Sequence, residues 1–157
     1  FFDKFVGADG MRDDVLPDKL GANSLKDRIL IISPVSPKTK ARSDFISASK
    51  AAGGNPNGPF VAQGYDAAMM LALAIQKAGS TDRTKISAAL RAIGTPPGIV
   101  IGPGEWKKAV SAIKAGKDIN YNGAAGPHDF DKAGDVGRVY ADSVIKDGKF
   151  VENKAIE

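Results

Sequence analysis

The sequence predicts an α/β fold, in which strands at both ends of the chain flank a block of helices. Residues 29–32 are four consecutive aliphatic residues, which is typical of a strand buried in a parallel sheet. Near the C-terminus, two strand-like runs flank Asp147 and Gly148, a pair typical of a two-residue hairpin turn. Between these segments, residues 67–75 are apolar throughout, which indicates a buried helix.

Composition limits the class of partner. The chain has 157 residues, with 22 basic and 18 acidic residues and a formal charge of +4. Its densest basic cluster, Lys38, Lys40 and Arg42, lacks the interleaved aromatic residues of a nucleic-acid surface. We therefore expect a solvated helix start there and no nucleic-acid partner. Cysteine is absent, which excludes disulfides and thiolate metal sites.

We find no pattern of a targeting signal or of a membrane span in the given residues. Its longest apolar run is about half of what a bilayer crossing requires. The first residues lack both a methionine and the pattern of a secretion signal. We therefore expect that a leader was removed or that the chain begins inside a larger protein.

The first two elements should be strands. Residues 1–7 predict a short strand, which ends in a turn around Asp9. Residues 28–33 predict a second strand that is buried on both faces and is stopped by Pro34 and Pro37.

Four helices should follow. The first lies within residues 40–52, ends before Gly53, and turns one side inward, formed by Phe45, Ile46 and Ser49. The second runs over residues 60–78 and stops at Gly79. Because it is apolar around its whole circumference, other elements must cover it on several sides.

The third helix should be capped by Ser80 or Thr81 and end at Gly94, with an inner face formed by Ile86, Ala89, Leu90 and Ile93. Residues 95–104 hold a possible short strand. The fourth helix covers residues 105–116, with Trp106, Val110 and Ile113 at turn spacing. The hairpin around Asp147 and Gly148 closes the chain.

Residues 126–138 carry three aspartates and the histidine, and the spacing of the aspartates partly fits a calcium loop. The fit fails because Ala133 and Tyr140 occupy positions that need oxygen ligands. We therefore expect a polar turn anchored by a buried Phe130, and no metal site. His128 has no nucleophile motif to act on, so we expect it to be exposed and non-catalytic. Residues 98–108 lack the spacing of a phosphate loop, so no cofactor is expected.

Two polar residues lie in apolar surroundings where a ligand could reach them. Asp9 follows a strand end, where α/β folds place ligand contacts, and its carboxylate could pair with an ammonium group. Tyr65 lies at the start of the long helix and could face a cleft, while Asp66 caps amides. Each residue taken alone also has a purely structural interpretation.

Several segments, in order, carry a resemblance to a known family: "FVGADGM", "FVAQGYDAAMMLALAIQKAGSTD", "LRAIG", "GAAGPHDFDKAGDVGR" and "VYADSVIKDGKFV". Together they resemble the C-terminal part of type I periplasmic amino-acid-binding proteins, the leucine/isoleucine/valine-binding-protein-like receptors of ABC importers. The resemblance extends along essentially the whole chain.

This resemblance implies a type I periplasmic-binding-protein fold, a trap of two lobes joined by three crossover strands, of which the chain is a C-terminal fragment. Residues 1–28 would belong to the second lobe and residues 29–138 to the first. Residues 139–157 would supply a crossover strand and a second-lobe hairpin. The missing N-terminal part would complete the first lobe and provide the contacts to the ligand's carboxylate.

The resemblance also implies a function. Asp9 would pair with the ammonium group of the ligand, and Tyr65 would supply an aromatic contact from the opposite lobe. Asp9 is one methylene shorter than the glutamate of the best-known members, which leaves the identity of the ligand open. The partners would be a small molecule such as an amino acid and an ABC permease of the inner membrane, and the location periplasmic or extracellular and membrane-anchored.

Two other functions stay open at this point. A ligand-sensing domain of a signalling or regulatory protein has the same fold, and fold alone does not decide function. An amide-processing enzyme is less favoured, because the sequence offers neither a nucleophile nor a metal constellation.

Overall fold

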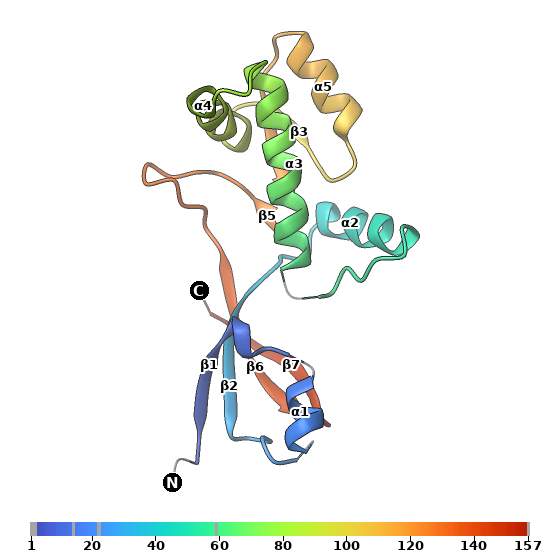
Figure 1. The fold of residues 1–157 in the computed structure, drawn as a ribbon, viewed down its shortest axis with the longest axis vertical. Coiled ribbons are helices and arrows are strands. Elements are labelled where there is room, and N and C mark those ends of the chain that lie inside the picture. Colours follow the sequence, from blue (N-terminus) through green and yellow to red (C-terminus); the bar gives the residue numbers. More distant parts are fainter. Residues whose placement is uncertain (1–2, 14, 22, 59, 157) are drawn as a thin grey trace. The chain divides into compact units, whose positions relative to one another are not determined.

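The computed structural model describes residues 3–13, 15–21, 23–58 and 60–156. The chain divides into two compact units (Figure 1). Unit 1 comprises residues 1–35 and 138–157, and unit 2 comprises residues 36–137. The α/β class predicted from the sequence is confirmed, because both units combine strands with helices.

Unit 1 is a four-stranded sheet in the order β1-β2-β6-β7. The parallel pair is β1 (Phe5–Ala8) and β2 (Ile29–Val35), joined through the 3-10 helix η1 (Asp9–Met11) and α1 (Val15–Leu20). The antiparallel hairpin is β6 (Val139–Lys146) and β7 (Lys149–Ile156). On one face of the sheet lies a small core formed by Leu25, Ile29, Ile31 and Ile145, with Leu16 and Phe150 packed against it.

The predictions for unit 1 were right about the strands and wrong about the surroundings of β2. Asp147 and Gly148 both have positive φ, 50° and 73°, as the predicted hairpin turn requires. In β2, however, Ile31 is fully buried and Ile32 is 38% exposed, so only one face of the strand is covered. The expectation that both faces are buried is therefore wrong for this chain.

Pro34 also does not stop β2, which continues to Val35. The reason is its position at the end of the sheet. On the β1 side, pairing ends at Ile32, while on the other side Pro34 pairs with Tyr140. A proline is tolerated in a strand where one side lacks a neighbour, because its missing N–H is not needed there.

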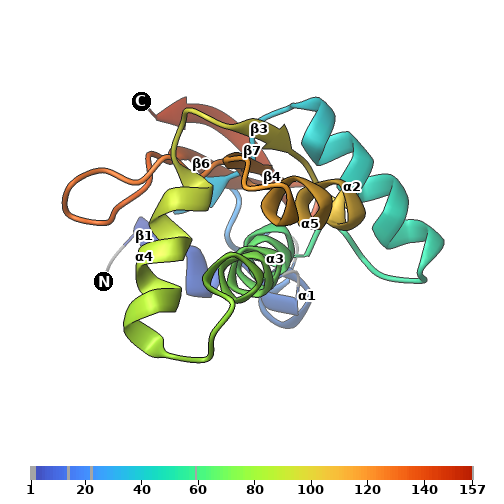
Figure 2. The ribbon, with the colours of Figure 1, turned by 90° about the horizontal axis from the view of Figure 1, so that it is seen from above.

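Unit 2 contains four helices, α2 (Lys40–Ala51), α3 (Val61–Ala78), α4 (Arg83–Gly94) and α5 (Trp106–Lys114), in its described residues. Its sheet has the order β3-β4-β5 and consists of β3 (Ile99–Ile101), β4 (Ile119–Gly123) and β5 (Gly126–Pro127). Seen from above, α3 lies between α4 and α5 (Figure 2), and all three helices contact β4.

The helix ends follow local chemistry. Thr39 caps α2 by accepting a hydrogen bond from the amide of Arg42 at 3.1 Å, so the basic cluster does form a helix start. Gly79 ends α3 in the left-handed conformation, as predicted. The cap of α4 is Asp82 and not Ser80 or Thr81, because Asp82 accepts from the amide of Lys85 at 3.0 Å.

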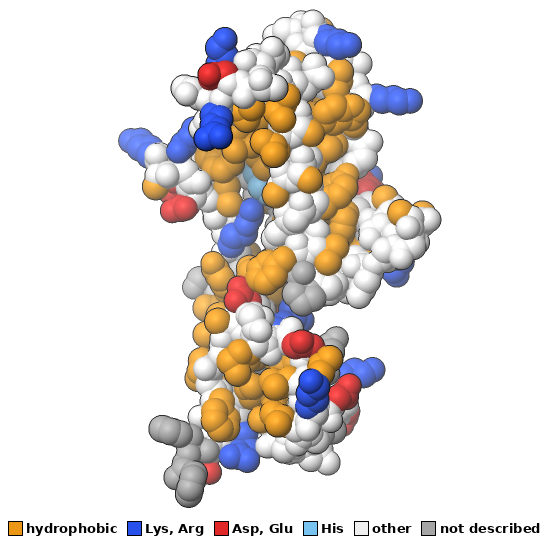
Figure 3. Space-filling model, viewed as in Figure 1, with side chains coloured by type: hydrophobic (Ala, Val, Ile, Leu, Met, Phe, Trp, Pro, Cys, Tyr) orange, Lys and Arg blue, Asp and Glu red, His pale blue; other side chains and the backbone are white. Residues whose placement is uncertain are grey.

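The core of unit 2 covers α3 on one side only. Its buried members come from the three helices and the sheet, and they are Met70, Leu73, Ala74, Ala89, Ile93, Ile101, Ala109, Ala112, Ile119 and Tyr121. Leu71 is 51% exposed and Ile75 is 39% exposed, and hydrophobic side chains gather over this part of unit 2 in Figure 3. The cover on several sides that the apolar circumference of α3 predicts is therefore not supplied by the described residues of this chain. In the described part of the chain, no helix has the length and apolar character needed to cross a membrane.

Candidate functional site

Asp9 lies directly after β1, at the first residue of η1. Gly7 leaves room beside this turn, because a Cβ there would require the flexible ends of the Met11 and Ile31 side chains to move. The amide N–H of Gly10 donates to Asp9 Oδ1 at 2.7 Å, and the amide of Arg12 donates to the Asp9 carbonyl at 2.9 Å. Asp9 is thus held at the carboxyl end of a parallel strand pair, the edge at which open α/β sheets bind ligands.

The carboxylate of Asp9 keeps most of its acceptor capacity. It is half-buried, and it forms no ion pair with any other residue that the structure describes. A carboxylate offers about four lone-pair positions, and the Gly10 amide uses one of them. The position suits a charged donor such as an ammonium group.

Tyr65 lies near the start of α3 in unit 2 and is half-buried. Its ring packs against Phe45 of α2, with the ring centroids 5.0 Å apart and a tilt of 49°. The amide N–H of Gly104 donates to the Tyr65 hydroxyl at 3.0 Å. In that bond the hydroxyl is an acceptor, so its own proton is still available for donation.

Asp66, the next residue, is fully buried and is surrounded by donors. Its Oδ1 accepts from the Tyr121 hydroxyl at 2.8 Å and from the amide of Ala124 at 2.8 Å. Its Oδ2 accepts from the amide of Ala125 at 2.7 Å. Burial, together with the Asp66 carboxylate, raises the pKa of Tyr121, so that this hydroxyl keeps its proton and donates it.

As expected, the Asp66 side chain accepts hydrogen bonds from backbone amides. These amides, however, lie in another part of the fold than expected. The amides belong to the turn between β4 and β5, not to the first turn of α3. We describe Asp66, Tyr121, Gly123, Ala124 and Ala125 as the Asp66 clamp. Gly123 fits because a Cβ there would fall on the Asp66 carboxylate.

His128 is also part of this region, and the expectation that it is exposed is wrong. It is 6% exposed, its Nε2 lies 3.7 Å from Asp66 Oδ2, and its ring centroid lies 5.7 Å from that of Tyr121. The sequence around it suggested a surface turn because of the neighbouring Pro127. The structure buries it because β5 leads the chain back past β4 and Asp66.

The loop that follows is a polar turn, as predicted. The amides of Gly134 and Asp135 donate to Asp131 Oδ1 at 2.8 and 2.9 Å, and these hydrogen bonds lower the pKa of Asp131. Phe130, which was expected to be buried, is half-buried; it packs against the core of unit 2 and forms an isolated β-bridge with Val136. Within the described ranges of the chain, no three histidine or acidic side chains converge as metal ligands.

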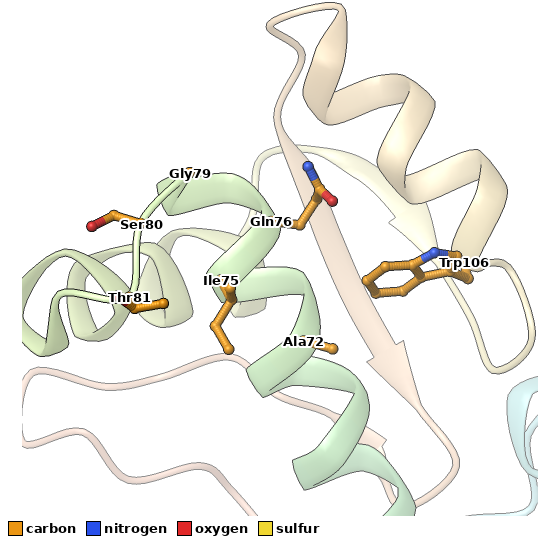
Figure 4. Close-up of a pocket in the computed structure, with 7 residues that line it drawn as sticks. All are labelled: Ala72, Ile75, Gln76, Gly79, Ser80, Thr81 and Trp106. Carbon is orange, nitrogen blue, oxygen red and sulfur yellow. The ribbon is translucent and has the colours of Figure 1, made fainter.

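A groove on unit 2 runs along the exposed side of α3 (Figure 4). Apolar and uncharged polar side chains line it, with Ala72, Ile75 and Gln76 on α3, Trp106 on α5, and Gly79, Ser80 and Thr81 in the loop after α3. Among the described residues that line the groove, none carries a charge that could fix a zwitterion. The groove belongs to the exposed apolar side of α3 and contains neither Asp9 nor Tyr65.

Sequence reasoning singled out Asp9 and Tyr65 and missed what surrounds Tyr65. The Gly104 amide lies in no recognisable motif, and the segment that holds Ala124 and Ala125 carried a family resemblance but did not indicate a contact with α3. A signal did exist in the small residues at 123–126, because a run without bulky side chains indicates a close approach of backbone to another group.

Comparisons with known proteins give the chain a family context. The model of the receptor family ligand binding region matches residues 4–141. The chemotactic signal transduction system substrate-binding protein BasB of Halobacterium salinarum is 33% identical over 78 residues, which are 50% of this chain and 19% of that protein.

Two solved structures share the fold. The leucine-binding protein LivK of Thermotoga maritima superposes with a TM-score of 0.68 and 24% identity, covering 99% of this chain and 38% of that one. The branched-chain amino acid transporter substrate-binding protein LivJ of Streptococcus pneumoniae, in complex with isoleucine, gives a TM-score of 0.58 with 16% identity, covering 96% and 37%. The chain therefore spans less than two fifths of the solved proteins it matches.

Proposed function

The chain belongs to the family of receptor ligand-binding regions, and from this premise we propose that it is part of an extracytoplasmic solute-binding receptor. The receptor captures an amino acid or a similar small polar ligand between two lobes and delivers it to an ABC importer. Members of this family are usually non-catalytic, in agreement with a receptor that makes and breaks no bond.

The observation that carries the proposal is the Asp9 carboxylate. It is held at the carboxyl end of a parallel strand pair, with acceptor capacity unused by any described cation. A charge-assisted hydrogen bond from a ligand ammonium would satisfy it. The names of the solved relatives, a leucine-binding protein and a protein in complex with isoleucine, favour an amino acid as the ligand.

Tyr65 supplies the second contact in this proposal. It lies in unit 2, whereas Asp9 lies in unit 1. A ligand that touches both has a higher affinity for the closed arrangement than for the open one, and it shifts the population toward closure by that difference. Residues 1–28 and 139–157 would then act with the second lobe, and residues 29–138 with the first.

The rest of the protein is the first partner in this proposal. The chain matches 38% of LivK, and both units expose apolar side chains such as Ile32 and Leu71. We expect residues outside this chain to cover these faces and to bind the ligand's carboxylate. An ABC permease of the inner membrane would be the partner in transport, and the location would be periplasmic or extracellular with a membrane anchor.

The test is a binding titration of the intact protein. Isothermal titration calorimetry against the twenty amino acids should identify at least one that binds. Small-angle X-ray scattering should then show a smaller radius of gyration in the presence of that amino acid. Absence of binding to every amino acid, with the protein folded, would rule out the amino-acid receptor.

A second candidate is a ligand-sensing domain of a signalling protein. The relative BasB favours it, because its name places it in a chemotactic signal transduction system. Both candidates bind a ligand through the same residues. They differ in the partner, so co-purification with an ABC permease supports transport and co-purification with a chemotaxis transducer supports sensing.

A further inference from the structure

The Asp66 clamp connects two distant parts of the chain, which is more than the capping of one helix or one turn requires. Asp66 is completely buried, and a buried carboxylate is costly unless several donors satisfy it. Here three donors do so, from the Tyr121 hydroxyl and the amides of Ala124 and Ala125, and His128 Nε2 lies 3.7 Å away. The three donor residues, Tyr121, Ala124 and Ala125, are 55 to 59 residues away from Asp66 in the chain. The clamp therefore ties α3 to the turn between β4 and β5.

The same turn supports the ring of Tyr65. Ala124 and Ala125 are buried in one cluster with Phe45 and Ala62, and Tyr65 packs against that cluster. The two amides that donate to Asp66 thus belong to the two residues whose methyl groups lie in this cluster. Release of the amides would let these methyl groups shift in the packing around Tyr65.

The hydroxyl of Tyr65 depends on the placement of its ring. It accepts a hydrogen bond from the Gly104 amide at 3.0 Å, which leaves its proton free to point toward a ligand. A shift of the ring would lengthen this bond and move the proton, and misplacement of about 1 Å is enough to weaken a preorganised contact.

We propose that Asp66 is a positioning residue for ligand binding, which acts through the Ala124–Ala125 turn to hold Tyr65 in the orientation that contacts the ligand. This inference rests on the proposed function of the chain as a solute-binding receptor. Asp66 itself does not touch the ligand, because its carboxylate is enclosed by the protein.

The experiment uses the intact protein with Asp66→Asn, Tyr65→Ala and the double variant, titrated with L-isoleucine and L-leucine. Asparagine keeps the shape of the side chain but replaces one acceptor oxygen by an NH₂ group, which opposes the amide and hydroxyl donors of the clamp. We expect Asp66→Asn to weaken binding about tenfold in the wild-type background. In the Tyr65→Ala background the same change should weaken binding by less than about twofold, because the group it positions is absent.

Ile93→Ala is the matched control, because Ile93 is fully buried in the core of unit 2 and outside the clamp. It should lower the unfolding midpoint and leave the dissociation constant unchanged at a temperature where every variant is folded. Equal weakening by Asp66→Asn in both Tyr65 backgrounds, or equal weakening by Ile93→Ala, would overturn the positioning role and leave the receptor function standing. Absence of binding by the wild type to both ligands and to the other amino acids would overturn the receptor function, and the positioning role with it.

Discussion

Two regions of the chain each place an aspartate next to an apolar element, and the two carboxylates are used in opposite ways. Asp66, in α3, is completely buried and accepts hydrogen bonds from one hydroxyl and two amides. Asp9, after β1, is half-buried and accepts one hydrogen bond from the adjacent amide. Protein donors occupy the lone pairs of Asp66, whereas most of those of Asp9 are left for a ligand.

The comparison teaches that the environment of a carboxylate, and not its position beside a helix or strand, decides its role. A buried charge is retained only where its partners belong to the fold, so its removal affects stability, and it affects binding only through the residues that those partners hold in place. A partly exposed carboxylate with spare acceptors contributes little to the fold, so its removal affects binding.

The largest effect is expected for Asp66→Ala in the intact protein. The change leaves the amides of Ala124 and Ala125 and the Tyr121 hydroxyl buried without their acceptor. Loss of one partner of a buried charged network costs about 3–5 kcal/mol. Urea unfolding should show this loss as a lower midpoint with an unchanged slope.

Tyr121→Phe is the control within the same clamp, because it removes one donor and keeps both amide bonds. We expect it to cost about 1 kcal/mol. An Asp66→Ala variant no less stable than Tyr121→Phe would show that the clamp does not hold the fold, and the contrast between Asp66 and Asp9 would fail.

The second prediction concerns Leu71, and tests whether its side chain, which is exposed in this chain, is also exposed in the intact protein. Leu71 and Leu73 lie two residues apart on α3, and Leu73 is fully buried while Leu71 is 51% exposed. If residues outside the chain cover α3, both Leu71→Ala and Leu73→Ala should cost about 2–5 kcal/mol. We expect this result by urea unfolding of the intact protein. A Leu71→Ala cost within about 0.5 kcal/mol would show instead that this side of α3 stays exposed.

The third prediction concerns Asp9→Asn. The change removes the charge and keeps the shape, so it should weaken the binding of a zwitterionic amino acid by about 1.5–3 kcal/mol. Its effect on stability should stay within about 0.5 kcal/mol, because the site is not fully buried. Calorimetric titration and urea unfolding measure the two quantities on the same variant. An unchanged dissociation constant would end the assignment of Asp9 to the ligand.

Local patterns were enough to predict most of the fold. The Asp147–Gly148 turn needs positive φ, the stop at Gly79 needs a left-handed residue, and the long apolar run needs a helix, and all three are present. The alternating strand β4 was missed because it is short and its residues, Asn120 and Asn122 among them, are half polar. The burial of both faces of β2 was mispredicted because burial depends on neighbours that are distant in the sequence, and no local pattern reports them.

The site was less predictable than the fold. Asp9 and Tyr65 could be selected because each is a polar residue at the end of an apolar element, and their roles stay predictions. The burial of His128 and the partners of Asp66 depend on contacts between residues more than 50 positions apart. Such contacts arise only when β4 and the turn after it pack beside α3, and nothing within either segment indicates the other.

The smallest effect on stability is expected for a change at Glu105, whose side chain is more exposed than that of Asp66 but not fully exposed. The Gly102 amide donates to Glu105 Oε2 at 2.8 Å, and this bond, helped by Lys108, lowers the pKa of Glu105. A carboxylate with a lowered folded-state pKa stabilises the fold above its unfolded pKa of about 4.3, and that contribution is lost as the pH falls through the folded value. Urea unfolding at pH 7 and pH 3 should therefore show a smaller acid-induced loss for Glu105→Gln than for the wild type.

The difference should stay below about 1 kcal/mol, because the Glu105 side chain is 42% exposed and solvent screens its interactions. A carboxylate at this level of exposure thus contributes measurably but weakly, between the structural role of Asp66 and the ligand-directed role proposed for Asp9. An equal acid-induced loss of stability in the two proteins would mean that the hydrogen bond from the Gly102 amide does not persist in solution. A carboxylate with this exposure would then make no contribution to the stability of the fold.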